Sequence, residues 1–277
     1  MANLWACCLL AISFKWMDVL GQDLNQTIDL GKLAKVVAPL ATVHARVVGG
    51  EMTTIEKLGG YLIALRYKKD FICGGSLIHD LIVLTAAHCF IGREQVNNWQ
   101  AEGGITKLTD KGEVRKAKKY IRSGSFRVDD LNMDVAVMLL QKPMTGKKIK
   151  KVSLCSKDLK EGTKLTVSGW GLTEPKQVKP VKELRTVTVP IINKKKCRQT
   201  YRPTSNITNS MLCASVLGKQ DACTFDSGGP LVYGNEVCGI VSFGIGCASS
   251  RYPGVYTDVF YVKKFVEESM KNLLDNK

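Results

Sequence analysis

Residues 226–232 of this chain read DSGGPLV, in which a serine stands between an acid and two glycines at the start of an apolar run. Two other short segments stand out: residues 84–89 read LTAAHC, and residues 132–139 read NMDVAVML. Each alone has an ordinary interpretation, because such a histidine is most often a core residue, such an aspartate a turn residue and such a serine part of a loop. Together they place His88, Asp134 and Ser227 in one chain, the side-chain types with which a serine nucleophile is activated.

The order of the three segments resembles that of the trypsin and chymotrypsin family of serine proteases, and the resemblance extends over residues 47–277. It implies an all-β fold of two six-stranded antiparallel β-barrels, with the active site in the cleft between them and a C-terminal α-helix. It also implies that Ser227 is the nucleophile, that His88 is the general base, and that Asp134 orients the imidazole ring.

The apolar pattern favours the same fold class by itself. Short runs rich in β-branched residues recur between turn residues, as in an all-β barrel or sandwich; they cover 61–67, 81–84, 135–140, 165–167, 187–192 and 237–243. Near the end the period changes, and apolar residues three or four positions apart alternate with charged ones. This predicts one amphipathic helix packed on the domain, through Val259, Val262, Phe265, Val266, Met270 and Leu273.

The amino-terminal residues carry a short apolar run, residues 3–14, closed off by Lys15 and Asp18. It is too short to span a bilayer and is typical of a secretory signal peptide, although a buried N-terminal helix stays open as an alternative. We expect a signal peptide over 1–21, an activation propeptide over 22–46 and a trypsin-like domain over 47–277. No later segment approaches about 18 unbroken apolar residues, so we expect no membrane anchor and a secreted protein.

Ten cysteines are present, and Cys7 and Cys8 would leave with the signal peptide. An even set of eight then remains, which favours disulfides in an oxidising compartment over zinc, because no close Cys-x-x-Cys pair occurs among them. The resemblance implies bonds between Cys73 and Cys89, Cys197 and Cys213, and Cys223 and Cys247. Cys155 and Cys238 remain, and we expect them to pair. Glycosylation triplets begin at Asn25 and Asn206.

Substrate choice follows from the resemblance as well. Asp221, six residues before Ser227, matches the acid at the pocket floor that pairs with a substrate Arg or Lys. Ser242, Gly244 and Gly254 match the pocket walls, where glycines leave room for a long cation.

The resemblance further implies a precursor that is activated by cleavage after Arg46. The freed amino group of Val47 would then fold inward and pair with Asp226, which orders the pocket and the oxyanion hole.

One position departs from the family pattern. Two residues before the nucleophile, where the family has glycine, this chain has Phe225, and the neighbouring Thr224 replaces a more usual Gln. The backbone N–H groups of residues 225 and 227 would form the oxyanion hole. Phenylalanine keeps the N–H, but a backbone shape that suits only glycine would cost it about 1–3 kcal/mol. Two functions therefore stand: an active endopeptidase, or a catalytically weak homologue that acts as a binding or regulatory protein.

The composition indicates which kinds of partner the protein could have. The formal net charge of +15 favours acidic partners, and three lysine-rich clusters could bind a polyanion such as heparin, although a solvated basic surface is the simpler interpretation; the clusters are residues 147–151, 194–198 and 116–119. We otherwise expect a monomer whose partners are protein substrates, an activating protease and protein inhibitors. No metal site and no cofactor are expected, because the acids between Glu102 and Glu113 do not reproduce the calcium loop of some relatives.

Overall fold

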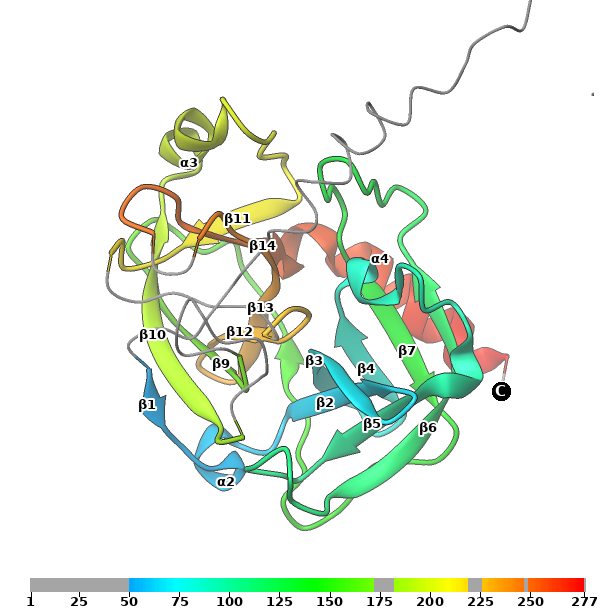
Figure 1. Ribbon diagram of the computed structural model, residues 1–277. Helices are drawn as coiled ribbons and strands as arrows, with labels where there is room; N and C mark the ends of the chain where they lie inside the picture. The colour runs from blue at the N-terminus through cyan, green and yellow to red at the C-terminus, as the bar shows by residue number, and fades with distance from the viewer. Residues whose placement is uncertain (1–49, 172–181, 219–225, 247–248, 277) are drawn as a thin grey trace, which may run out of the picture. The chain divides into compact units, whose positions relative to one another are not determined.

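Twelve strands build two closed barrels in the computed structural model, which describes residues 50–171, 182–218, 226–246 and 249–276 (Figure 1). All of these residues belong to one unit, residues 42–277, whereas a separate unit, residues 1–41, lies outside the described part. The expected signal peptide and propeptide therefore stay predictions.

The first barrel closes in the order β2-β3-β4-β7-β6-β5, because β5 pairs back onto β2. Every pairing in it is antiparallel. Its strands are β2 (Leu62–Tyr67), β3 (Asp70–His79), β4 (Ile82–Thr85), β5 (Trp99–Gly103), β6 (Glu113–Arg122) and β7 (Ala136–Leu140).

The second barrel runs β10-β11-β14-β13-β12-β9 and closes where β9 pairs with β10. Its strands are β9 (Lys164–Gly169), β10 (Arg185–Ile192), β11 (Met211–Ala214), β12 (Pro230–Tyr233), β13 (Glu236–Phe243) and β14 (Gly254–Asp258). Two short strands extend this sheet: β1 (Glu51–Met52) pairs with β10, and β8 (Ser153–Leu154) pairs with β13. The predicted fold class of two six-stranded barrels is confirmed.

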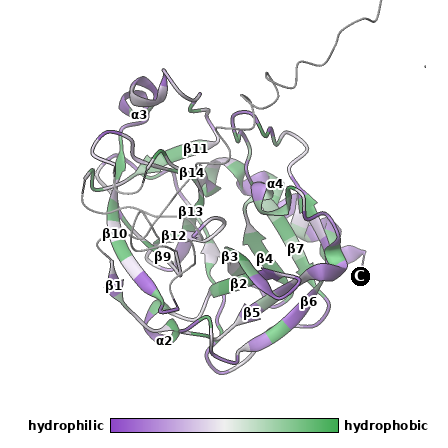
Figure 2. Cartoon of the chain, viewed as in Figure 1, coloured by the Kyte–Doolittle hydropathy of each residue, from purple (hydrophilic) through white to green (hydrophobic). Residues whose placement is uncertain are grey.

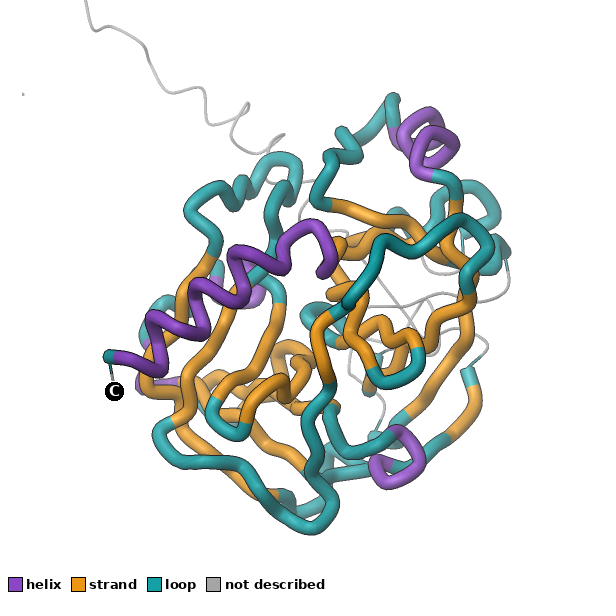
Figure 3. Tube along the Cα trace, turned by 180° about the vertical axis from the view of Figure 1, so that it is seen from behind, coloured by secondary structure: helices purple, strands orange, loops and turns teal. Residues whose placement is uncertain are grey.

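Three α-helices complete the described chain: α2 (Ile55–Leu58), α3 (Lys194–Tyr201) and α4 (Val259–Asp275). The predicted C-terminal helix is α4, whose buried side includes Val259, Val262, Val266 and Leu273 and packs against β7 and β13. Seen from behind, α4 lies along the outside of the first barrel (Figure 3). None of the helices in the described residues is long and apolar enough to cross a membrane.

The core explains why these segments form barrels. Buried apolar side chains from both barrels and from α4 make one continuous cluster, and a second, smaller cluster lies under α3. Figure 2 shows hydrophobic colours along strands such as β4 and β7, and mostly hydrophilic ones on α3 and on much of β6. Burial of apolar surface on the inner faces of the strands is the main force that stabilises this architecture.

Candidate active site

His88 lies on a short 3-10 turn, Ala87–Phe90, that directly follows β4. The neighbouring Cys89 is bonded to Cys73 on β3, which ties the turn to the barrel wall. The imidazole side chain keeps 21% of its surface exposed, so one side of the ring faces outward. The turn therefore presents a partly accessible histidine on a rigid support.

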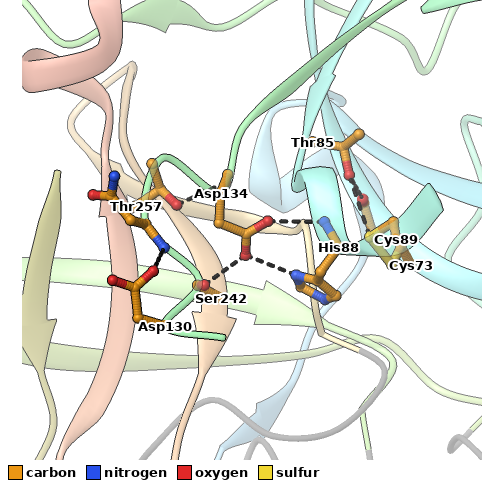
Figure 4. A network of polar contacts seen from close by, with 10 residues as sticks. Cys73, Thr85, His88, Cys89, Asp130, Asp134, Ser242 and Thr257 are labelled. Carbon is orange, nitrogen blue, oxygen red and sulfur yellow. Dashed lines mark hydrogen bonds and ion pairs between the residues drawn. A yellow bond between two sulfur atoms is a disulfide. The ribbon is translucent and has the colours of Figure 1, made fainter. Parts of the chain in front are cut away.

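Asp134 precedes β7 and is completely buried. Its Oδ2 lies 2.7 Å from Nδ1 of His88, and its Oδ1 accepts a hydrogen bond of 2.9 Å from the backbone N–H of the same residue. Ser242 on β13 donates its hydroxyl to Oδ2 at 2.6 Å, and Thr257 on β14 donates to the Asp134 carbonyl at 2.8 Å. Figure 4 shows the carboxylate between His88 on one side and the second-barrel side chains on the other.

The electrostatics of this pair follow from burial and contact. Burial opposes ionisation of Asp134, but the charge of His88 and the hydrogen bonds from His88 and Ser242 outweigh it, so the pKa of the carboxyl is lowered. Burial likewise disfavours the charged ring of His88, but the attraction of Asp134 outweighs it and raises the pKa of His88. Because Oδ2 of the ionised Asp134 can accept but not donate a hydrogen bond, Nδ1 of His88 carries the proton. Nε2 of the neutral ring then has no proton and can act as a base.

Ser227 lies in the turn that enters β12, and both barrels hold this turn in place. The backbone N–H of Gly74 on β3 donates to the Ser227 carbonyl at 2.8 Å, and the N–H of Gly228 donates to Val241 on β13 at 2.8 Å. Gly228 has a φ of +76°, and a Cβ there would collide with Thr85 Oγ1 and lie 3.2 Å from Cys89 Sγ. The turn that carries Ser227 is thus packed directly against the segment that carries His88.

The buried carboxylate of Asp226 lies against the end of β9. Its Oδ1 accepts a hydrogen bond of 2.9 Å from the N–H of Gly171. A Cβ on Gly169 would collide with the same oxygen, so only glycine permits this approach.

The described pocket residues lie on or next to two neighbouring strands: Ser242 on β13, Gly244 directly after it, and Gly254 on β14. Gly254 begins β14, opposite Ala214 of β11. A Cβ on Gly244 would come no nearer than 3.9 Å to any neighbour, one of which is the Cα of Gly254. The remaining predicted site residues, namely Arg46, Val47, Asp221, Phe225, Cys223 and Cys247, lie outside the described residues.

Three disulfides are present in the described chain: Cys73–Cys89, Cys155–Cys238 and Cys197–Cys213. Two groups of three potential metal ligands also occur there: Cys73, His88 and Cys89 form one, and Cys155, Glu236 and Cys238 form the other. In each group the two cysteines are bonded to each other, so neither sulfur is a thiolate ligand. Neither group has the chemistry of a metal centre.

Two side chains were missed as supports of the site. Ser242 was predicted only as a pocket residue, yet its hydroxyl bonds Asp134, and Thr257 was not singled out at all. Their partner lies 108 and 123 residues away along the chain, and no local pattern signals such a contact.

Two antiparallel barrels, a buried carboxylate on a histidine and a serine in the adjoining turn define the chymotrypsin-fold serine proteases as the class. The family model Trypsin matches residues 47–266, and the chain belongs to this family of trypsin-like serine proteases.

Three curated relatives illustrate the similarity. The chain is 59% identical over 250 residues to Seminase of Drosophila melanogaster, covering 90% of each chain. It is 35% identical over 236 residues to Trypsin alpha of the same species, covering 84% of this chain and 91% of the relative. To Trypsin 5G1 of Aedes aegypti it is 36% identical over 228 residues, covering 80% and 84%.

Proposed function

We propose that this trypsin-like serine protease is secreted as an inactive precursor and, once cut after Arg46, hydrolyses peptide bonds that follow Arg or Lys. The observation that carries the proposal is the buried Asp134 carboxylate on Nδ1 of His88, next to the turn that bears Ser227. We further propose that the protein is a monomer whose partners are protein substrates, an activating protease and protein inhibitors.

In the proposed mechanism Ser227 attacks the scissile carbonyl carbon while Nε2 of His88 takes its proton. The ring becomes positively charged in this step, and the ionised Asp134 stabilises that charge without accepting the proton. His88 then donates the proton to the leaving amine, and a water molecule repeats the sequence to release the acyl group. The N–H groups of Phe225 and Ser227 would donate to the oxyanion that develops.

Specificity is proposed to come from Asp221, supported by the two glycines of the pocket wall. Gly244 and Gly254 have no side chains, which leaves room for an extended Arg or Lys. A carboxylate at the end of such a pocket favours a cation, because an uncharged substrate side chain would leave the charge buried without a partner.

Activation is proposed to act through Asp226, which is buried next to the Ser227 turn. Cleavage after Arg46 would free a positively charged amino group on Val47. The resulting ion pair with Asp226 would order the nearby backbone, which explains a silent precursor.

A weak homologue that binds rather than cleaves stays as the second candidate, because Phe225 replaces the glycine of the oxyanion hole. Complete loss of one oxyanion donor would lower turnover by about 10²–10³.

One experiment separates these functions. The purified precursor is cut after Arg46 and assayed on small amide substrates that end in Arg, Lys or Phe, with Ser227→Ala as the inactive control. Cleavage after Arg and Lys that appears only upon the cut supports the proposal. Activity before the cut would contradict the proposal of an inactive precursor. A correctly cut but inert protein would favour the second candidate, a homologue that binds rather than cleaves.

A further inference from the structure

Helix α3 carries a row of positive charges along one face. Lys195, Arg198 and Arg202 follow the spacing i, i+3 and i+7, which places them on the same side of a helix; Arg202 is the C-cap residue and keeps helical backbone angles. Gln199 lies among them, and no acidic residue occurs between Lys194 and Tyr201. The row from 195 to 202 is about 10 Å long at the helical rise of 1.5 Å per residue.

The opposite face fixes the helix to the second barrel. Cys197 is bonded to Cys213 on β11, and the Tyr201 hydroxyl donates to the Pro253 carbonyl at 2.6 Å. Asn193 caps the first turn by accepting from two backbone N–H groups. The positive row is therefore presented by a rigid support, which lowers the entropy cost of binding.

A hollow of 380 Å³ lies along this row, between α3 and the loop that follows it. Its lining contains cations, polar groups and one apolar residue: Lys195, Arg198, Gln199, Arg202, Ser205, Asn206 and Ile207. The guanidinium of Arg198 is held in place, because Nε donates to the Ile207 carbonyl at 2.9 Å and Nη2 to Asn209 Oδ1 at 2.6 Å.

The other two basic clusters differ from the α3 face in their charge balance or in their exposure. In residues 147–151, Lys148 pairs with Glu56 and Lys151 with Asp80, so half of that charge is already balanced. On β6, Lys116, Lys118 and Lys119 are exposed on the outside of the barrel. The α3 face combines a hollow with three cations, Lys195, Arg198 and Arg202, that make no ion pair among the described residues.

We propose that the α3 face, defined as Lys195, Arg198 and Arg202 with the hollow between α3 and residues 205–207, binds a sulfated polysaccharide. Sulfate groups match the fork of donors that arginine offers, and a row of cations fits successive anionic groups of a linear polymer. The proposal depends on the proposed secretion in one respect only, because secretion would bring the protein to the setting in which such polymers occur.

Other anionic partners fit the lining less well. No aromatic side chain lines the hollow, so the bases of a single-stranded nucleic acid would find no surface for stacking. Ile207, the apolar residue in the lining, is itself 2% exposed, so the face offers nothing to insert into a lipid bilayer.

The test measures binding to heparin with the Ser227→Ala protein, so that it does not depend on catalysis. N-linked glycan is first removed enzymatically, because Asn206 at the rim of the hollow begins an acceptor triplet. Lys195→Gln/Arg202→Gln removes two cations that make no ion pair among the described residues, and leaves Arg198 with its structural hydrogen bonds. Lys118→Gln/Lys119→Gln on β6 is the matched control with the same loss of charge.

The α3 variant should elute from heparin at lower NaCl than the parent, and the slope of log affinity against log salt should fall by about two. The heparin affinity of the β6 variant should change little, and both variants should keep the thermal midpoint of the parent.

Equal losses of heparin affinity in the two variants would overturn the proposed site on α3, because net charge alone would then explain binding. Equally tight binding of the parent to polyglutamate or single-stranded DNA would overturn the choice of a sulfated polysaccharide. Neither result would bear on cleavage after Arg46 or on peptidase specificity.

Discussion

At Asp134, side chains from three separate elements converge on one buried residue. His88 comes from the turn after β4, Ser242 from β13 and Thr257 from β14, and the carboxylate accepts from the first two. A buried carboxylate without such partners would pick up a proton, whereas this one has a lowered pKa and stays charged. The residue can therefore hold His88 in the tautomer that leaves Nε2 free as a base.

Asp134→Asn should lower kcat by about 10⁴, the loss that the same change causes in other serine proteases of this family, because the amide favours the wrong tautomer. The acid limb of the pH profile should also move. His88 must be neutral to act as a base, so kcat/KM rises as pH rises through its pKa, which Asp134 raises. Without the negative charge the limb should shift to lower pH. An acid limb at the same pH in Asp134→Asn and in the parent would contradict the electrostatic coupling between Asp134 and His88.

Phe225→Gly should raise kcat/KM on a small Arg amide by about 10–10³, the range from partial to full recovery of one oxyanion donor. It should also strengthen inhibition by compact protein inhibitors that fill both sides of the cleft, because we expect a side chain next to the oxyanion hole to border the cleft, where a phenyl group would obstruct them. Thr224→Gln, which restores the neighbouring family residue, is the control and should change neither quantity. No gain with glycine would mean that the loop accommodates Phe225 without strain.

At the level of elements, the strand β6 shows where apolar patterns do not suffice. Its sequence, EVRKAKKYIR, is mostly charged, and Ala117 is its only buried residue. The apolar pattern does not predict this strand. It is held by backbone hydrogen bonds to β5 and β7, which do not require an apolar face on β6 itself. In contrast, the predicted runs 61–67, 135–140 and 187–192 contain β2, β7 and most of β10, strands that bury side chains in the core.

The turn after Ser227 should tolerate no side chain at Gly228. Gly228→Ala would place a methyl group against Thr85 Oγ1 and 2.7 Å from the Gly74 carbonyl oxygen, and the positive φ adds strain. We expect a loss of about 3 kcal/mol or more in the free energy of unfolding, together with loss of activity.

Gly234→Ala is the control for this substitution. Gly234 has a φ of +60°, and a Cβ there meets nothing within 4 Å, so only the backbone cost of about 1–2 kcal/mol applies. Urea unfolding of both variants measures the difference. Equal losses would show that the close contact between the Ser227 turn and the first barrel does not matter for stability.

Across the whole molecule, disulfides tie together parts of the chain that are far apart in sequence. Cys155–Cys238 joins residues 83 positions apart and links the segment after β8 to β13, whereas Cys197–Cys213 joins residues 16 positions apart. A longer closed loop restricts the unfolded chain more, so the first bond should stabilise the fold more than the second.

Replacing Cys155 and Cys238 together by alanine should lower the free energy of unfolding by about 4.5 kcal/mol, against about 3 kcal/mol for Cys197 and Cys213. All four residues are buried to the same degree, so the packing cost of the replacement is similar in both variants. Urea unfolding at neutral pH provides the comparison. A larger loss for the Cys197 pair would contradict the loop-length argument and point instead to the role of that bond in holding α3.

The period of apolar residues was enough for an all-β fold and the helix at the C-terminus, because it is a property of neighbouring residues. The two barrels and the candidates His88, Asp134 and Ser227 followed from the resemblance of three short motifs to the trypsin family. Only the tertiary structure revealed that Ser242 and Thr257 support Asp134, that Gly171 binds the Asp226 carboxylate, and that the basic face of α3 borders a hollow. The three hydrogen bonds at the site join residues 55 to 123 positions apart. The contacts of Asp134 form where the first barrel meets the second and that of Asp226 forms between segments next to β9 and β12, so no single stretch of sequence contains them.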